Sequence, residues 1–144
     1  MYRSRKNTLS YKPDTYTKNL RQGKIKCPFC DLSNQKIVKE YKHMYVIENL
    51  YPYQYWEEGI EVKDHFLLFP KRHLVSLGEF NQKEKTEYID LTADYEAQGY
   101  NLYIRALKNP TKSIDHHHTH LFKIGTKKAR LYLFLKKPYF IIRK

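Results

Sequence analysis

One segment of the chain has the periodicity of an amphipathic helix, and it constrains the fold more than any other feature. Asn81, followed three residues later by Glu84, resembles a capping box, which is typical of a helix N-terminus. The positions that then recur at helical spacing are Tyr88, Leu91, Thr92 and Tyr95. Gly99 is suited to end the helix. We therefore expect one long helix over about residues 82–98.

The remaining apolar runs are short and typical of strands. The predicted strands lie within residues 36–49 (two strands with a turn at 40–43), 65–70, 100–107, 113–125, 129–135 and 139–143. Pro70 should end the third of these, because proline cannot donate to a strand ladder. Short turns between strands favour antiparallel pairing. The predicted fold class is therefore α+β, with a mainly antiparallel sheet and one long helix against it.

Four of the seven histidines fall within five positions, in the stretch SIDHHHTHLFKIG. On a strand the side chains alternate, so His116, His118 and His120 share one face, while His117 and Thr119 point to the other. Imidazoles about 7 Å apart in a row cannot readily share one ion, given the rise of roughly 3.3 Å per residue. One histidine can bind a metal while its neighbour does chemistry. The alternative is an exposed, His-rich strand with chance metal affinity.

The positive charge is concentrated at the N-terminus. The chain of 144 residues has a net charge of +12, and residues 1–26 contribute +7 of it, with eight lysines and arginines against Asp14. We divide the chain into a basic extension, 1–26, and a single domain, 27–144. Such an extension is more often a solvated tail than a binding device. Its functional alternative is attraction of polyanions, either nucleic acid or nucleotide phosphates.

Targeting signals are absent from the sequence. No apolar run approaches the roughly 20 residues of a membrane span, and the first residues hold no apolar signal-peptide core. We expect a cytoplasmic protein without a membrane partner. In that setting the pair Cys27-Pro-Phe-Cys30 indicates metal binding or redox chemistry rather than a structural disulfide.

Three motifs, in order, resemble those of the histidine triad (HIT) superfamily. HHHTHLF, residues 116–122, fits the signature His-x-His-x-His-x-x. CPFC, residues 27–30, resembles the Cys-x-x-Cys of many bacterial members, and DHFLLFPKRHL, residues 64–74, resembles the strand followed by Pro-Lys-x-His. The match covers about residues 27–124. The chain departs from the family at His117 and Thr119, where apolar residues are usual.

The resemblance implies an enzyme that acts on nucleotides through histidine. A neutral imidazole is a nucleophile at physiological pH, and a covalent intermediate divides a difficult step in two. The middle histidine, His118, would attack the α-phosphate, and His120 would hydrogen-bond the phosphate oxygens. Ser113 matches a hydroxyl near the leaving group, or is simply a turn residue. Asn101 matches an asparagine lining the pocket. His65 would lie near the triad, or have a structural role.

Nucleotide recognition is expected at the end of an early strand. Asn49 stands where the family usually has an acidic residue that bonds the ribose, and an amide makes this bond without charge. Phe29 and Leu50 are candidates for the base pocket. The long loop predicted between residues 49 and 65 holds further aromatic residues: Tyr51, Tyr53, Tyr55 and Trp56. These could stack on a base, cover a neighbouring subunit or pack on the surface.

HIT hydrolases of the zinc-bearing, bacterial type bind the ion through four side chains. The matching residues in this chain are Cys27, Cys30, His73 and His116. Such a Cys2His2 site is closed to water, so the zinc would be structural. Family members commonly pair through their sheets, so the resemblance also implies a homodimer.

These interpretations converge on one function and leave two alternatives. The sequence predicts a nucleotide hydrolase or nucleotidyl transferase that forms a nucleotidyl-His118 intermediate. One alternative is an enzyme of the deadenylation type, which removes a nucleotide from a nucleic-acid end and would use the basic tail. The other is a non-catalytic nucleotide-binding module.

Overall fold

The computed structural model describes residues 2–3, 18–20 and 22–128. The described strands are β1 (Tyr2–Arg3), β2 (Ile37–Glu40), β3 (Met44–Glu48), β4 (Tyr53–Tyr55), β5 (Ile60–Pro70), β6 (Asn101–Ile104) and β7 (Thr119–Lys128). The other elements are the helix α3 (Gln82–Ala97) and the 3-10 turns η1 (Leu32–Asn34), η2 (Glu57–Gly59) and η3 (Leu77–Glu79), and residues 18–20 are also helical. The fold class is α+β, as predicted.

The sheet is antiparallel and is centred on β5. β5 pairs with β3 on one side and with β7 on the other. β2 continues the sheet beyond β3, and β6 continues it beyond β7. β4 pairs with the beginning of β5, and β1 pairs with β4. The histidine-bearing strand therefore lies between the central strand and β6.

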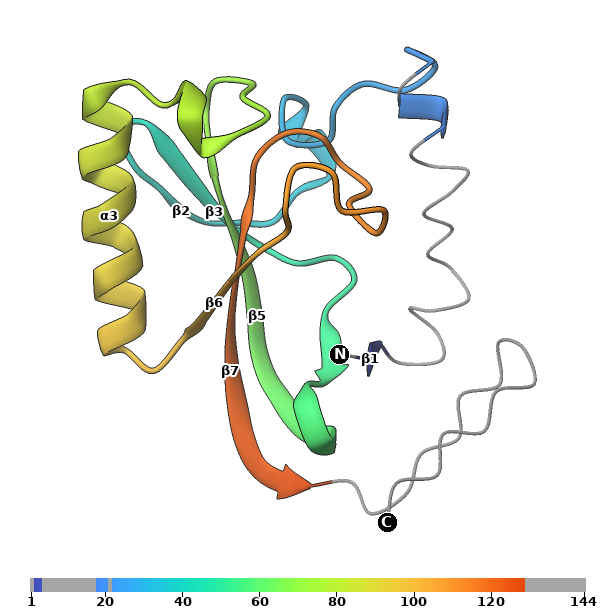
Figure 1. Ribbon diagram of the computed structural model, residues 1–144, viewed down its shortest axis with the longest axis vertical. Helices are drawn as coiled ribbons and strands as arrows, with labels where there is room; N and C mark the ends of the chain where they lie inside the picture. The colour runs from blue at the N-terminus through green and yellow to red at the C-terminus, as the bar shows by residue number, and fades with distance from the viewer. Residues whose placement is uncertain (1, 4–17, 21, 129–144) are drawn as a thin grey trace.

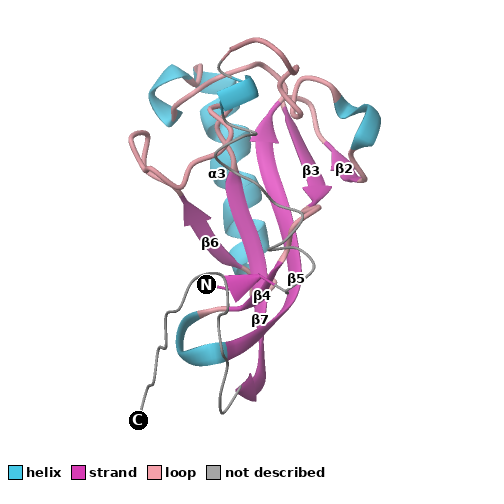
Figure 2. Cartoon of the chain, turned by 90° about the vertical axis from the view of Figure 1, so that its right-hand side faces the viewer, coloured by secondary structure: helices cyan, strands magenta, loops and turns pink. Residues whose placement is uncertain are grey.

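The helix forms as its sequence predicts. The side chain of Asn81 accepts a hydrogen bond from the Glu84 amide, and Glu84 accepts one from the Asn81 amide, so the capping box is complete. Gly99 adopts a φ of 85° just beyond the helix, a conformation that glycine reaches without steric cost. Figures 1 and 2 show α3 lying along one face of the sheet.

The two faces of the sheet have different partners. The face toward α3 holds the larger core, in which Met44, Val46, Leu68 and Leu121 of the sheet pack with Tyr88, Leu91 and Tyr95 of the helix. On the opposite face Phe29 packs on Ile47, Leu67 and Phe69. In Figure 1 the segment that carries the cysteines lies on this second side, away from α3. A site built on this face is therefore separated from the helix by the sheet.

Three predicted boundaries were wrong. The segment from Asn49 to His65 is not one long loop, because it contains β4 and the beginning of β5 at Ile60. Charged residues lie between the apolar ones in this segment. The first part of β5 is held there by hydrogen bonds to β4 on one side and to β7 on the other. β6 ends at Ile104, before the predicted limit of 107, and β7 begins only at Thr119. His116 and His118 thus lie on the segment that leads into the strand.

Other predicted strands are confirmed, and one predicted hairpin lies outside the described residues. The two strands within 36–49 and the end of β5 at Pro70 are confirmed. The predicted hairpin over 129–143 lies outside the described residues. None of the helices in the described ranges combines the length and the apolar character needed to cross a membrane.

Candidate metal centre and active site

The four predicted metal ligands lie together. Cys27, Cys30, His73 and His116 each present one ligand atom, and these atoms lie within 4.8 Å of one another. The Cys30 Sγ atom is 3.2 Å from Nδ1 of His73 and 3.7 Å from Nδ1 of His116, and the Cys27 Sγ atom is 3.6 Å from the latter. Three separate segments of the chain therefore meet at one point.

The arrangement fits a tetrahedral ion. Zinc lies about 2.3 Å from sulfur and about 2.0 Å from nitrogen, which places the ligand atoms of a tetrahedron roughly 3.3–3.8 Å apart. The two distances to His116, 3.6 and 3.7 Å, fall within this range, and the distance from Cys30 to His73, 3.2 Å, is slightly shorter. His116 is also oriented for the role, because its Nε2–H donates to the carbonyl of Pro70 at 2.9 Å. Its Nδ1 lone pair is thereby directed toward the cysteines.

The Cys30 thiol favours its neutral form until a cation binds. Burial, together with the hydrogen bond and charge of Cys27, raises the pKa of Cys30 to about 11. The two cysteines are free thiols rather than a disulfide. A bound cation would reverse this preference, since a coordinating thiol is deprotonated.

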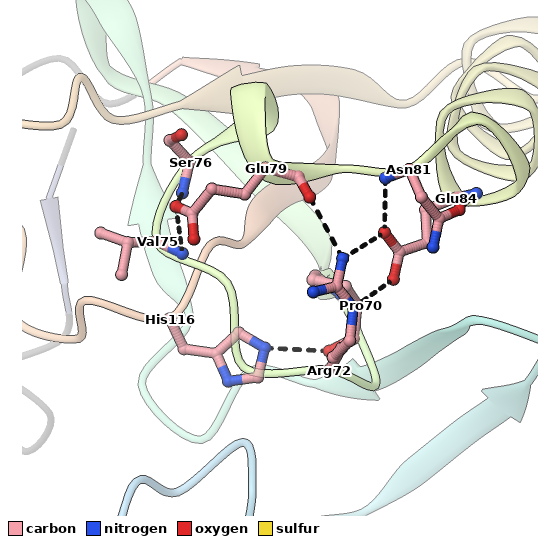
Figure 3. A network of polar contacts seen from close by, with 8 residues as sticks. All are labelled: Pro70, Arg72, Val75, Ser76, Glu79, Asn81, Glu84 and His116. Carbon is pink, nitrogen blue, oxygen red and sulfur yellow. Dashed lines mark hydrogen bonds and ion pairs between the residues drawn. The ribbon is translucent and has the colours of Figure 1, made fainter.

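A polar network holds the loop that carries His73. Arg72 donates from Nε and Nη2 to the two carboxylate oxygens of Glu84, at 3.0 and 2.9 Å, and to the carbonyl of Glu79 at 3.1 Å. Glu79 in turn accepts from the amides of Val75 and Ser76. Figure 3 shows this network between the N-terminus of α3 and the segment after β5. Because Arg72 precedes His73, the network ties a metal-ligand segment to the helix cap.

His118 lies on the same side of the sheet, with a defined tautomer. Its Nδ1 is 2.9 Å from the carbonyl of His116, and a carbonyl can only accept, so Nδ1 carries the proton and Nε2 the lone pair. The ring meets Phe29 edge-on, at 5.2 Å between centroids. Burial lowers the pKa of His118 to about 4, and the charges of Lys112 and Arg105 act in the same direction. The imidazole is therefore neutral at physiological pH.

His120 lies beside His65 and His118. The Tyr53 amide donates to Nδ1 of His65 at 3.0 Å. Nε2 of His65 lies 3.0 Å from the amide nitrogen of Asn49 and 2.9 Å from Nδ1 of His120. The rings of His118 and His120 are 5.1 Å apart, so the lone pair of His118 lies next to a second imidazole.

The other predicted site residues divide into those that join this group and those that do not. Asn49 places its amide nitrogen 3.0 Å from Nε2 of His65, whereas Leu50 is 51% exposed. Phe29 is buried against His116 and His118. Ser113 lies half-buried on the segment before His116. Asn101 lies opposite Phe122 and donates to its carbonyl, so the structure does not bring it to His118.

Three further residues lie near the histidines, and the sequence had indicated only Tyr53, as one of several aromatic residues that could stack on a base. Tyr53 is 2% exposed, and its hydroxyl lies 3.5 Å from both ring nitrogens of His120. Arg105 donates to that hydroxyl at 3.0 Å, and Tyr103 lies 5.8 Å from His120 between ring centroids. Alternation along β6 is the signal that could have found Tyr103, which is paired to His120, and Arg105 follows two residues later.

Comparison with known proteins identifies the fold. No family model and no curated protein matches the chain. Among solved structures, a histidine triad nucleotide-binding protein from Candida albicans aligns with a TM-score of 0.50 and 18% identity, over 82% of this chain and 87% of that one. At such identity the likeness establishes the fold alone.

Two bacterial structures are similar to a comparable extent. A histidine triad protein from Clostridium difficile aligns with 20% identity and a TM-score of 0.47, over 74% of this chain and 96% of that one. A HIT family hydrolase from Legionella pneumophila aligns with 18% identity and a TM-score of 0.45, over 76% and 90% of the two chains.

Proposed function

We propose that this chain, whose fold is that of the histidine triad proteins, cleaves nucleotide derivatives at the α-phosphate through a covalent intermediate on His118. The proposal is carried by the neutral imidazole of His118, which lies beside the ring of His120. His118 offers a lone pair on Nε2, and the ring of His120 lies 5.1 Å away between centroids. A nucleophile next to a group that can donate a hydrogen bond to the phosphate is the arrangement that phosphoryl chemistry needs.

The reaction balances in two steps. In the first, Nε2 of His118 forms a bond to phosphorus while the bond from phosphorus to the leaving group breaks, and the leaving group departs with the electron pair and takes up a proton. The Nδ1–H of His118, which donates to the His116 carbonyl, stabilises the positive charge that forms on the ring. In the second, water attacks phosphorus and loses a proton, and His118 regains its lone pair. The products are a nucleoside monophosphate and the protonated leaving group.

We propose that zinc occupies the Cys2His2 cluster in a structural role. All four positions of a tetrahedron would be filled by protein, which leaves none for a reacting water. The ion would fix the carbonyl of His116, because it holds the ring of the same residue. The hydrogen bond that sets the His118 tautomer would thereby depend on the metal centre.

The experiment that tests the activity follows the intermediate directly. Adenosine 5′-phosphoramidate is mixed with the protein, the reaction is quenched with base, and the intact mass is measured. We expect an adenylyl adduct and release of AMP by the wild type, and neither by His118→Ala. His117→Leu removes the adjacent imidazole on the opposite face and should retain both. An adduct that persists in His118→Ala, or a wild type without adduct or AMP release, would count against the mechanism and favour the binding module.

We further propose a small nucleotide rather than a nucleic-acid end as substrate. An exposed platform of aromatic side chains would favour single strands, but Tyr53 is buried beside His120 instead. Deleting residues 1–24 should therefore change AMP release by a few-fold at most. Tight binding of single-stranded DNA or RNA that weakens steeply with salt, by a slope of roughly −0.7 per phosphate contact, and that needs residues 1–24, would support the alternative.

A further inference from the structure

Arg105 lies just beyond the end of β6, close to the segment that carries His118. β6 pairs with β7 so that Tyr103 lies opposite His120 and Ile104 opposite Thr119. Arg105 follows the last paired residue of β6, and His118 precedes the first residue of β7. The end of this pairing therefore brings a guanidinium side chain near the two imidazoles.

The side chain of Arg105 is directed toward His120 by two contacts. Nη2 donates to the Tyr53 hydroxyl at 3.0 Å, and that hydroxyl lies 3.5 Å from both ring nitrogens of His120. The guanidinium carbon lies 5.6 Å from the centre of the Tyr103 ring. On its other side Nη1 donates to the Thr111 hydroxyl. These contacts hold the charged group beside Tyr53 and Tyr103, whose rings both lie next to His120.

The positive charge of Arg105 suits the reaction proposed for this site. Nucleophilic attack adds negative charge to the oxygens on phosphorus, and a positive charge held nearby stabilises it. A guanidinium keeps its charge and binds phosphate oxygens in a planar fork. Charged phosphate oxygens are also stronger acceptors than the neutral hydroxyls of Tyr53 and Thr111. A bound phosphate would therefore recruit guanidinium donors that are already positioned.

We infer that Arg105 binds the phosphate group that His118 attacks, and that it selects substrates for an anionic phosphoryl centre. This inference rests on the proposed function and adds a phosphate-binding residue to it. Arg105 would contact the nonbridging oxygens while the phosphorus–nitrogen bond to His118 forms and the leaving group departs. Its contribution should be greatest in the transition state, where the oxygens carry the most charge.

The test compares a charged with an uncharged ligand. AMP and adenosine are titrated against wild type, Arg105→Gln, Arg105→Met and Arg105→Lys by calorimetry. Loss of the charge should weaken AMP binding about 10- to 100-fold, as expected for a charge-assisted hydrogen bond, and leave adenosine binding unchanged. Arg105→Met preserves the apolar stem over Tyr103, so it remains informative if Arg105→Gln unfolds. Arg105→Lys should recover part of the AMP affinity.

Turnover provides a second measurement. With adenosine 5′-phosphoramidate, Arg105→Gln should lower kcat more than it raises KM, with kcat/KM falling about 100-fold. Lys108→Gln removes an equal charge from an exposed position three residues after Arg105. It is the matched control and should change neither kcat nor KM. If the Arg105 variants lost AMP and adenosine binding equally, or lost neither, the inference about Arg105 would be overturned. That result would not contradict the proposed function. A wild type that neither binds AMP nor reacts would instead refute the proposed function, and the role of Arg105 with it.

Discussion

Replacing Arg72 with methionine should destabilise the protein by removing the partner of a buried carboxylate. Glu84 is 3% exposed, and its side chain accepts three hydrogen bonds, two from Arg72 and one from the Asn81 amide at 2.8 Å. Arg72→Met removes two of these three. Breaking a fully buried ion pair costs about 3–5 kcal/mol. The Arg72 side chain is 55% exposed, so water screens the pair, and we expect a loss of about 2–3 kcal/mol.

The assay is urea unfolding followed by circular dichroism, at pH 7 and with metal held constant. Lys71→Met is the matched control, because Lys71 forms a more exposed pair with Glu40 and should cost under about 1 kcal/mol. In a Glu84→Gln background, where no buried charge remains, Arg72→Met should cost about 1 kcal/mol or less. The reasoning would be refuted if Arg72→Met and Lys71→Met were equally stable. It would also be refuted if Arg72→Met cost the same free energy of unfolding in the wild-type and Glu84→Gln backgrounds.

The pH dependence of the same variant gives an independent check. The hydrogen bonds from Arg72 are the main cause that lowers the pKa of Glu84 below its ordinary value of 4.5. As the pH falls below about 4.5, the unfolded chain therefore takes up this proton before the folded one does. The contribution of the pair is complete above that pH and is lost as the pH falls through the lowered pKa. The difference in unfolding free energy between wild type and Arg72→Met should narrow over this acid range; a constant difference would contradict the assignment.

Three further predictions address the metal and the helix-facing side of the sheet. Purified protein should hold about one zinc per chain. Cys27→Ser, or a chelator added to the wild type, should lower the melting temperature, because metal binding is coupled to folding. Metal-free protein with an unchanged melting temperature would exclude the site. Within the described part of the chain, no hydrogen-bond partner reaches the buried Nε2 of His117, so His117→Leu should stabilise by about 1 kcal/mol in urea unfolding, and a loss of stability would contradict this. Tyr88→Phe removes the 2.8 Å bond to the buried Thr119 hydroxyl and should cost about 1–2 kcal/mol in the same assay, whereas an unchanged midpoint would show that the bond contributes nothing.

Local patterns in the sequence predicted the helix, whereas the resemblance to a family predicted the grouping of the metal ligands. The capping box at Asn81 and the glycine at position 99 act within a few residues, so they can be recognised without knowledge of the fold. Cys27 and His116 are 89 positions apart, and their proximity followed only from the resemblance between motifs. The structure brings these predicted ligands together.

Local patterns failed where pairing between distant strands decides the structure. β5 extends back to Ile60 because β4 and β7 supply hydrogen bonds on its two sides; the alternation of Ile60 and Val62 with charged residues is too short to indicate the strand by itself.

What the sequence determined by itself is the set of chemical groups: imidazoles, thiols and one long helix with its caps. What the tertiary structure decided is how those groups face one another. The tautomer of His118 depends on a carbonyl that no side-chain motif encodes. Asn101 lies opposite Phe122, and Arg105 lies beyond Ile104 near His118, because the register of β6 on β7 is fixed by pairing between the strands. A shift of one residue would turn every side chain of β6 to the other face, and that choice depends on contacts between segments far apart in the chain.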